Sequence, residues 1–161
     1  QRQMCIRDRL YKVNSIDPTD VEMLNEYYFE TMHHEFAHIL HQKKSYPTEY
    51  NQISAADYSS TGWQNRTELQ AWKLGFVTPY AGMQPQEDFV EVIANYLVKP
   101  DGFWENMLAN AGTEGAAKIQ SKFDMAKEWL MASWRIDIEE LRTIIIRRSE
   151  NIDSISENDI V

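Results

Sequence analysis

Apolar residues recur every three or four positions along two stretches of the chain, and this spacing predicts two core helices. The first helix is expected to begin at Asp17-Pro18, a capping residue followed by a proline suited to a first turn. It is expected to end near Gln42-Lys43-Lys44, whose cationic side chains favour a helix C-terminus. The second helix is predicted from Pro85 to the residue before Pro100. Its apolar positions are Phe89, Val90, Ile93, Ala94 and Leu97.

The remaining pattern predicts a mainly α protein with little strand. Leu10–Asn14 reads as one short strand, and the segment from Ser45 to Gln86 is irregular because glycine and proline punctuate it. Four shorter or later helices are expected: around Thr67–Leu74, from a cap at Asp101 to Gly112, from a cap at Thr113 to Trp134, and over Leu141–Arg148 after a capping box at Asp137 and Glu140.

Three parts of the chain differ in character. Residues 1–9 contain Met4-Cys5-Ile6-Arg7-Asp8-Arg9, which resembles a translated sequencing adapter, and we expect them to be a non-native scar. The single cysteine, Cys5, then says nothing about redox compartment. Residues 10–148 are expected to form one domain, and residues 149–161 a polar, acidic tail that frays.

Composition narrows the function classes. The chain has 161 residues, 43% hydrophobic and 12% aromatic, which is enough for one globular core. A formal net charge of -9 argues against a nucleic-acid groove. No apolar run is long enough to span a bilayer, so we expect no transmembrane segment.

Within the first predicted helix lies the motif His34-Glu35-Phe36-Ala37-His38. Two imidazoles four residues apart stand on one helical face, where both can bind one zinc ion. The intervening glutamate, Glu35, can then take a proton from water, as in metal-assisted hydrolysis. The alternative is a pair of structural histidines in the core.

A catalytic zinc site needs a third protein ligand. The extended motif H-E-x-x-H-x-x-G-x-x-H fails, because position 41 is His and position 44 is Lys. A glutamate from the second helix can replace it: Glu87 and Glu91 lie four apart on one face, so that one can bind metal while the other accepts the spare N–H of a ligand histidine. Alternatively, both acids merely favour the first helical turn.

His41 lies three residues past His38, with its Cα about 10.5 Å along the axis from that of His34 at the rise of a helix. We therefore expect His41 to support the site or to pack in the core, and not to bind the metal.

Three blocks carry a family resemblance: His34-Glu35-Phe36-Ala37-His38, Gly75-Phe76-Val77-Thr78-Pro79-Tyr80-Ala81 and Glu87-Asp88-Phe89-Val90-Glu91. Together they resemble a family of zinc metallopeptidases, bacterial surface lipoproteins associated with nutrient-import systems of the outer membrane. The layout is also similar to that of the anthrax lethal factor protease, in which a tyrosine lies seven residues before the glutamate ligand and a second glutamate four after it.

The resemblance implies that His34, His38 and Glu87 bind Zn²⁺. It also implies that Glu35 is the general base, that Tyr80 supports the oxyanion and that Glu91 holds a ligand histidine from behind.

The fold that the resemblance implies is zincin-like, with the HExxH helix packed against a second helix carrying the glutamate ligand. Few residues precede Asp17, so we expect the domain over residues 10–148 to be truncated and to lack most of the family's N-terminal sheet. The function that the resemblance implies is zinc-dependent hydrolysis of peptide or protein substrates, outside the cytoplasm and in association with a nutrient-import complex. The alternative is a non-catalytic lipoprotein module whose structural zinc helps it to hold protein or glycan.

Overall fold

The computed structural model describes residue 20 and residues 23–150. Within this part of the chain the regular elements are all helical, which confirms the mainly α class. They are, in order, η2 (Leu24–Phe29), α3 (Glu30–Lys43), α4 (Tyr50–Ile53), η3 (Gly62–Asn65), α5 (Glu68–Leu74), η4 (Tyr80–Met83), α6 (Pro85–Val98), α7 (Phe103–Asn110), α8 (Gly112–Trp134) and α9 (Ile138–Glu150). The predicted scar, the strand over residues 10–14, the cap at Asp17-Pro18 and residues 151–161 lie outside the described part.

The two predicted core helices are both present and pack against each other. The first runs as a six-residue π-helical segment, η2, that continues directly into α3. The buried side chains of α3 are those of His34, Ala37 and Leu40, which recur every third residue and so form one stripe. That stripe faces α6, and the HExxH motif therefore lies at the contact between the two helices.

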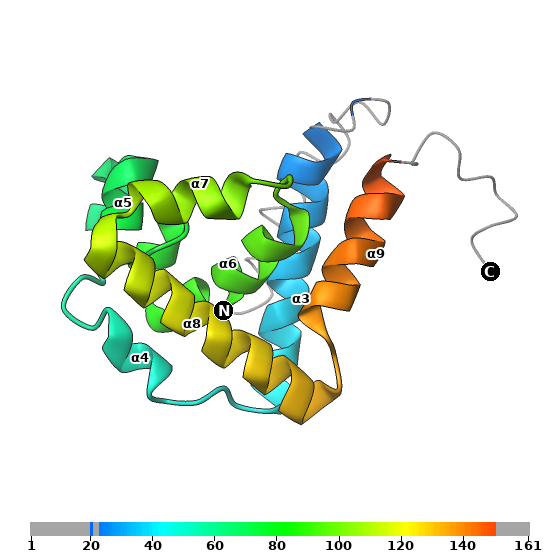
Figure 1. The fold of residues 1–161 in the computed structure, drawn as a ribbon. Helices are drawn as coiled ribbons and strands as arrows, with labels where there is room; N and C mark the ends of the chain where they lie inside the picture. The colour runs from blue at the N-terminus through cyan, green and yellow to red at the C-terminus, as the bar shows by residue number, and fades with distance from the viewer. Residues whose placement is uncertain (1–19, 21–22, 151–161) are drawn as a thin grey trace, which may run out of the picture.

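Helix α6 is the central element of the molecule. It lies between α3, α8 and α9 (Figure 1), and almost every side chain from Asp88 to Val98 is buried. Pro85 occupies its first turn, where a missing backbone N–H costs nothing. Each fully buried apolar side chain, such as Phe89 or Val92, stabilises the fold by about 1.5–3 kcal/mol relative to exposure. This burial fixes the face on which α6 presents its few polar residues.

A buried ion pair joins α6 to α8. Lys122 Nζ lies 2.6 Å from Asp88 Oδ2, and both side chains are fully buried. Tyr58 donates to the same carboxylate oxygen at 2.6 Å, and Lys122 donates to the carbonyl of Gly75 at 2.7 Å. Burial lowers the pKa of Lys122 and raises the pKa of Asp88, while their mutual attraction opposes both shifts. The pair ties α6, just after position 87, to the body of the protein.

Capping residues set both ends of helix α5 and the start of helix α9. Thr67 forms a capping box with Gln70 at the start of α5, and Gly75 ends that helix at φ +90°. A side chain at Gly75 would also meet Lys118 at 2.5 Å, so this position requires glycine. Asp137 Oδ1 accepts the backbone N–H groups of Glu139 and Glu140, which is the Asp137 half of the predicted capping box, and α9 begins at Ile138, three residues before the predicted Leu141. Helix α9 continues to Glu150, two residues past Arg148, the expected end of the helix.

Two predicted caps are wrong. Helix α7 is preceded by Gly102, at φ +81°, and Asp101 instead pairs with Arg142 at 2.9 Å. Glycine reaches the left-handed turn there without the steric cost that aspartate would incur. Helix α8 already begins at Gly112, so that Thr113 lies inside its first turn. No described helix combines the length and the apolar character that crossing a bilayer requires.

Candidate metal centre

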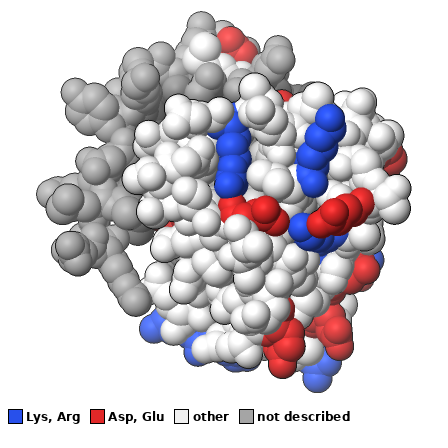
Figure 2. Space-filling view, turned by 90° about the vertical axis from the view of Figure 1, so that its left-hand side faces the viewer, with Lys and Arg blue, Asp and Glu red and all other residues white. Residues whose placement is uncertain are grey.

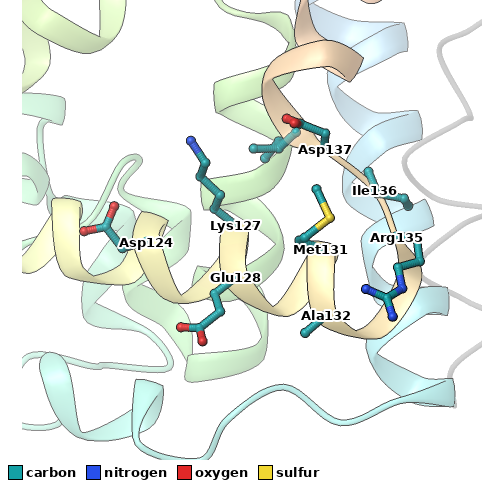
Figure 3. Close-up of a pocket in the computed structure, with 9 residues that line it drawn as sticks. Asp124, Lys127, Glu128, Met131, Ala132, Arg135, Ile136 and Asp137 are labelled. Atoms are coloured by element: carbon teal, nitrogen blue, oxygen red, sulfur yellow. The ribbon is translucent and has the colours of Figure 1, made fainter.

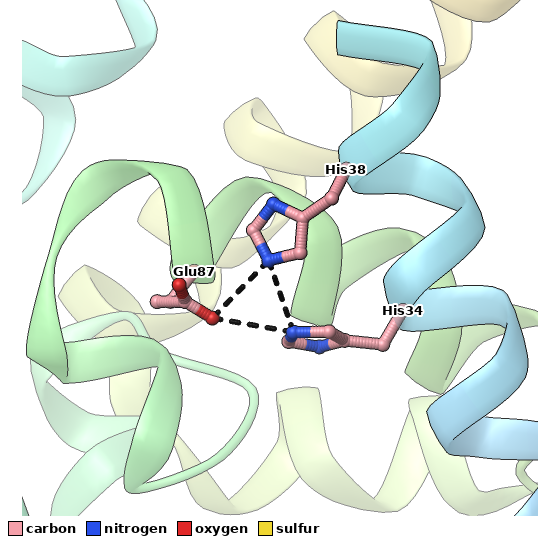
Figure 4. A group of neighbouring side chains, drawn as sticks. All are labelled: His34, His38 and Glu87. Carbon is pink, nitrogen blue, oxygen red and sulfur yellow. Dashed lines mark hydrogen bonds and ion pairs between the residues drawn. The ribbon is translucent and has the colours of Figure 1, made fainter. Parts of the chain in front are cut away.

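Three predicted ligand side chains converge between α3 and α6 (Figure 4). The Nε2 atoms of His34 and His38 are 3.1 Å apart. Glu87 Oε2 lies 3.2 Å from His34 Nε2 and 3.3 Å from His38 Nε2. His34 is buried, whereas His38 and Glu87 remain partly exposed. Solvent therefore reaches the cluster on the side of His38 and Glu87, whereas His34 is enclosed by the core.

These separations fit a metal ion. Four ligands at about 2.0–2.1 Å around tetrahedral zinc are separated from one another by about 3.3–3.4 Å, close to the 3.1–3.3 Å found here. Two imidazoles and one carboxylate are also a donor set of catalytic zinc sites. Residues 34, 38 and 87 would hold the ion.

The protonation pattern points the same way. His34 Nδ1 lies 2.7 Å from Glu91 Oε1, and an ionised carboxylate can only accept, so Nδ1 carries the hydrogen. In the neutral ring, Nε2 of His34 then carries a lone pair, which faces both Glu87 Oε2 and His38 Nε2. Lone pairs that converge on one point repel each other unless a cation lies between them. The cluster is therefore built for a positive charge.

Glu87 is anionic at neutral pH. Burial raises the pKa of its carboxyl, but hydrogen bonds from His34 and His38 and the positive charge of those rings outweigh burial when the rings are protonated, and a cation among the lone pairs of the neutral rings would act in the same direction. The net effect lowers the pKa of Glu87 well below its usual range. A carboxylate ready to bind a cation thus lies at the open side of the cluster.

The other predicted glutamate, Glu91, lies one helical turn farther along α6 and is 5% exposed. Besides His34 Nδ1, it contacts Thr78, whose hydroxyl donates to Glu91 Oε2 at 2.6 Å. Thr78 Oγ1 in turn accepts the backbone N–H of Ala81 at 3.1 Å. A chain of hydrogen bonds thus connects His34 to the turn that carries Tyr80. Sequence reasoning gave Thr78 no role, and its place within the block 75–81 was the only signal.

Tyr80 lies beside the cluster, and Glu35 is the residue that follows His34 on α3. Tyr80 is the first residue of η4, and its ring centroid is 6.0 Å from that of His34 and 5.0 Å from that of Trp63. Glu35 follows His34 on α3 and is partly exposed. Their catalytic roles remain predictions, and the structure brings Tyr80 beside a predicted ligand from a position 46 residues away in the chain.

A surface hollow of about 630 Å³ lies between the end of α8 and the start of α9 (Figure 3). Its lining includes Lys127, Met131, Arg135 and Asp137, and none of its lining residues belongs to the cluster. On the face shown in Figure 2, acidic and basic side chains lie next to one another and much of the surface is uncharged. That face therefore lacks, over its described residues, the extended basic patch that nucleic acid requires.

Fold and cluster together define a mainly α-helical protein with a His-His-Glu group compatible with a metal centre. Residues 3–139 match the family described as "Putative zinc-binding metallo-peptidase", and the chain belongs to this family.

Among solved structures, the chain is similar to a crystal structure of a "putative zinc-binding metallo-peptidase" from Bacteroides caccae ATCC 43185. The two are 50% identical with a TM-score of 0.84, over 89% of this chain. The match covers 55% of the neighbour, so the chain spans about half the length of that protein. No match was found among curated proteins.

Proposed function

We propose that this chain forms the zinc-binding part of a peptidase that hydrolyses amide bonds. The observation that carries the proposal is the convergence of His34, His38 and Glu87 on one point, with ligand-to-ligand separations suited to zinc. Membership of the family supports the same metal and the same reaction class.

The ligand set leaves room for chemistry. Within the described residues the group contains three side-chain ligands, which is the number that catalytic zinc sites use. A bound zinc ion supplies Lewis acidity, which polarises a carbonyl and lowers the pKa of water toward about 7. The alternative function, a structural zinc in a module that holds protein or glycan, would need a fourth side chain to close the site.

The protein's own groups handle the protons. Glu35 takes a proton from the attacking water and later passes it to the leaving amine, and its partial exposure gives it access to solvent. The Tyr80 hydroxyl donates a hydrogen bond to the oxygen of the scissile carbonyl as negative charge develops there. Glu91 holds the Nδ1–H of His34, so that Nε2 points toward Glu87.

The setting of the enzyme is proposed on the resemblance alone. The proposal is a surface lipoprotein outside the cytoplasm, beside a nutrient-import complex of the outer membrane, acting on peptides or proteins. Cell fractionation of the native host, with an antibody against this domain, tests the location directly.

The decisive experiment measures metal and activity on one sample. The protein is purified without a His tag, its zinc content is determined by mass spectrometry, and hydrolysis of a fluorogenic peptide library is followed. We expect about one zinc per chain and cleavage that a chelator removes and added zinc restores. The same assay is repeated on a version of the protein extended to the length of the Bacteroides caccae neighbour. If both versions bind zinc and neither cleaves any peptide of the library, the result would favour the non-catalytic alternative.

A further inference from the structure

His38 uses its two ring nitrogens in opposite directions. Its Nε2 faces the cluster, at 3.1 Å from His34 Nε2 and 3.3 Å from Glu87 Oε2. Its Nδ1 faces away and lies 2.9 Å from His41 Nε2. The partner of the second ligand ring is therefore another histidine from the next turn of the same helix.

This contact defines where the hydrogens lie. If Nε2 of His38 offers its lone pair to a cation, Nδ1 carries the ring hydrogen and donates it to His41 Nε2. His41 Nε2 must then be an acceptor. The contact selects one tautomer of His38 and one rotation of its ring, which are the two properties that a metal-ligating imidazole needs to have fixed.

The His41 ring is itself held in place. It lies edge-on to Tyr46, with centroids 5.6 Å apart, and edge-on to Phe89 at 6.3 Å. Tyr46 and Phe89 stack on each other at 4.2 Å. Phe89 belongs to α6, two residues after Glu87. One of the two rings that contact His41 therefore comes from the helix that supplies the carboxylate ligand.

The two ligand histidines differ in what stands behind them. His34 is backed by the carboxylate of Glu91, and His38 by the imidazole of His41. A further carboxylate behind His38 would add a third negative charge to a site that already holds Glu87 and Glu91. A neutral imidazole supplies the acceptor without that charge, and so it leaves more of the cation's charge available to polarise a substrate.

We infer that His41 is a positioning residue, which fixes the tautomer and orientation of His38 through the Nδ1-to-Nε2 hydrogen bond. The inference rests on the proposed metal centre, and it extends that centre with a residue that binds neither metal nor substrate. Its test reads zinc affinity and ring protonation, which do not depend on whether the protein cleaves peptides.

Two substitutions separate positioning from packing. His41→Phe keeps an aromatic ring against Tyr46 and Phe89 but removes the acceptor, whereas His41→Gln places an amide oxygen near the position of Nε2. Zinc dissociation constants are measured by competition with a chromophoric chelator. We expect about a 10–100-fold weaker affinity for His41→Phe and a change within about threefold for His41→Gln. His33→Phe, which removes an imidazole from the same helix, serves as the control and should bind zinc like wild type.

A measurement on the unaltered protein covers the case in which His41→Phe fails to fold. Long-range ¹H–¹⁵N spectra of the zinc-loaded protein should show His38 protonated on Nδ1 and His41 unprotonated on Nε2. Protonation of His41 at Nε2 would overturn the inference. Equal zinc affinity in wild type and His41→Phe would overturn the inference too. An equal loss of zinc affinity in His41→Phe and His41→Gln, or a loss of affinity in the control His33→Phe, would also overturn it. Failure of wild type to bind zinc would remove the metal centre altogether, whereas zinc binding without cleavage would count only against the proposed peptidase activity.

Discussion

Removing the buried lysine of α8 tests the reasoning about how the site is held. In Lys122→Met, the carboxylate of Asp88 stays fully buried and keeps the hydroxyl of Tyr58 but no cation, while the carbonyl of Gly75 loses its donor. Breaking one side of a buried ion pair costs about 3–5 kcal/mol of folding free energy. For a protein of this size, that corresponds to a fall in Tm of roughly 6–20 °C.

The neighbouring lysine on the same helix gives a matched control. Lys118 lies one turn earlier and pairs with Asp57 at 3.3 Å and with Glu114 at 2.8 Å, near the surface. An exposed pair contributes about 0–1 kcal/mol, so Lys118→Met should be nearly neutral. The double variant Asp88→Asn with Lys122→Met removes both charges together and should recover most of the loss, since no unpaired charge remains buried.

Urea unfolding of the metal-free variants, followed by far-UV circular dichroism, measures these free energies, and an unchanged m-value confirms that the same surface is exposed. If Lys122→Met lowers the free energy of unfolding by no more than Lys118→Met does, the unpaired carboxylate of Asp88 does not carry the expected cost. If the double variant is as unstable as Lys122→Met alone, the loss arises from packing and not from the isolated carboxylate of Asp88.

Three further predictions concern the centre and the surface. Glu35→Gln should keep zinc and lose turnover by at least about 100-fold, and hydrolysis that persists would rule out Glu35 as the base. Glu91→Gln should weaken the zinc affinity by about 10–100-fold, and Glu87→Ala should weaken it more. Chelator competition measures both affinities, and the reverse order would make Glu91 the ligand. Burial raises the pKa of Glu139, but bonding to Lys127 and Tyr96 outweighs it and lowers the pKa. Its stabilisation is therefore present above about pH 4.3 and is lost as the pH falls through the folded-state pKa. The stability gap between wild type and Glu139→Gln should narrow below about pH 4, and a gap that widens on acidification would contradict this sign.

The sequence predicted the elements that depend on local pattern. Both core helices follow from apolar spacing, and α6 additionally from the proline at its start. The grouping of His34, His38 and Glu87 followed from motif spacing together with the family resemblance, because the residues alone left Glu87 and Glu91 with competing interpretations. The glycine cap of α7 was missed because the turn between α6 and α7 depends on a left-handed φ that sequence patterns barely constrain.

What could not be predicted depends on tertiary packing. Asp88 and Lys122 are 34 positions apart, and periodicity alone does not say which buried charge meets which. The partner of His38 was equally hidden, because an i+3 spacing allows contact but does not require it. The stacked rings of Tyr46 and Phe89 decide that contact, and they come from separate segments.

Four of the five positions from 87 to 91 in α6 contact four different groups of the protein. Position 87 faces the imidazoles, 88 meets the lysine of α8, 89 packs against the ring at 41, and 91 holds the ring at 34. Successive residues of a helix turn by about 100°, so a single insertion or deletion within this turn would redirect all four together. We therefore expect the length of this segment to be more constrained than that of the other helices in the described part of the chain.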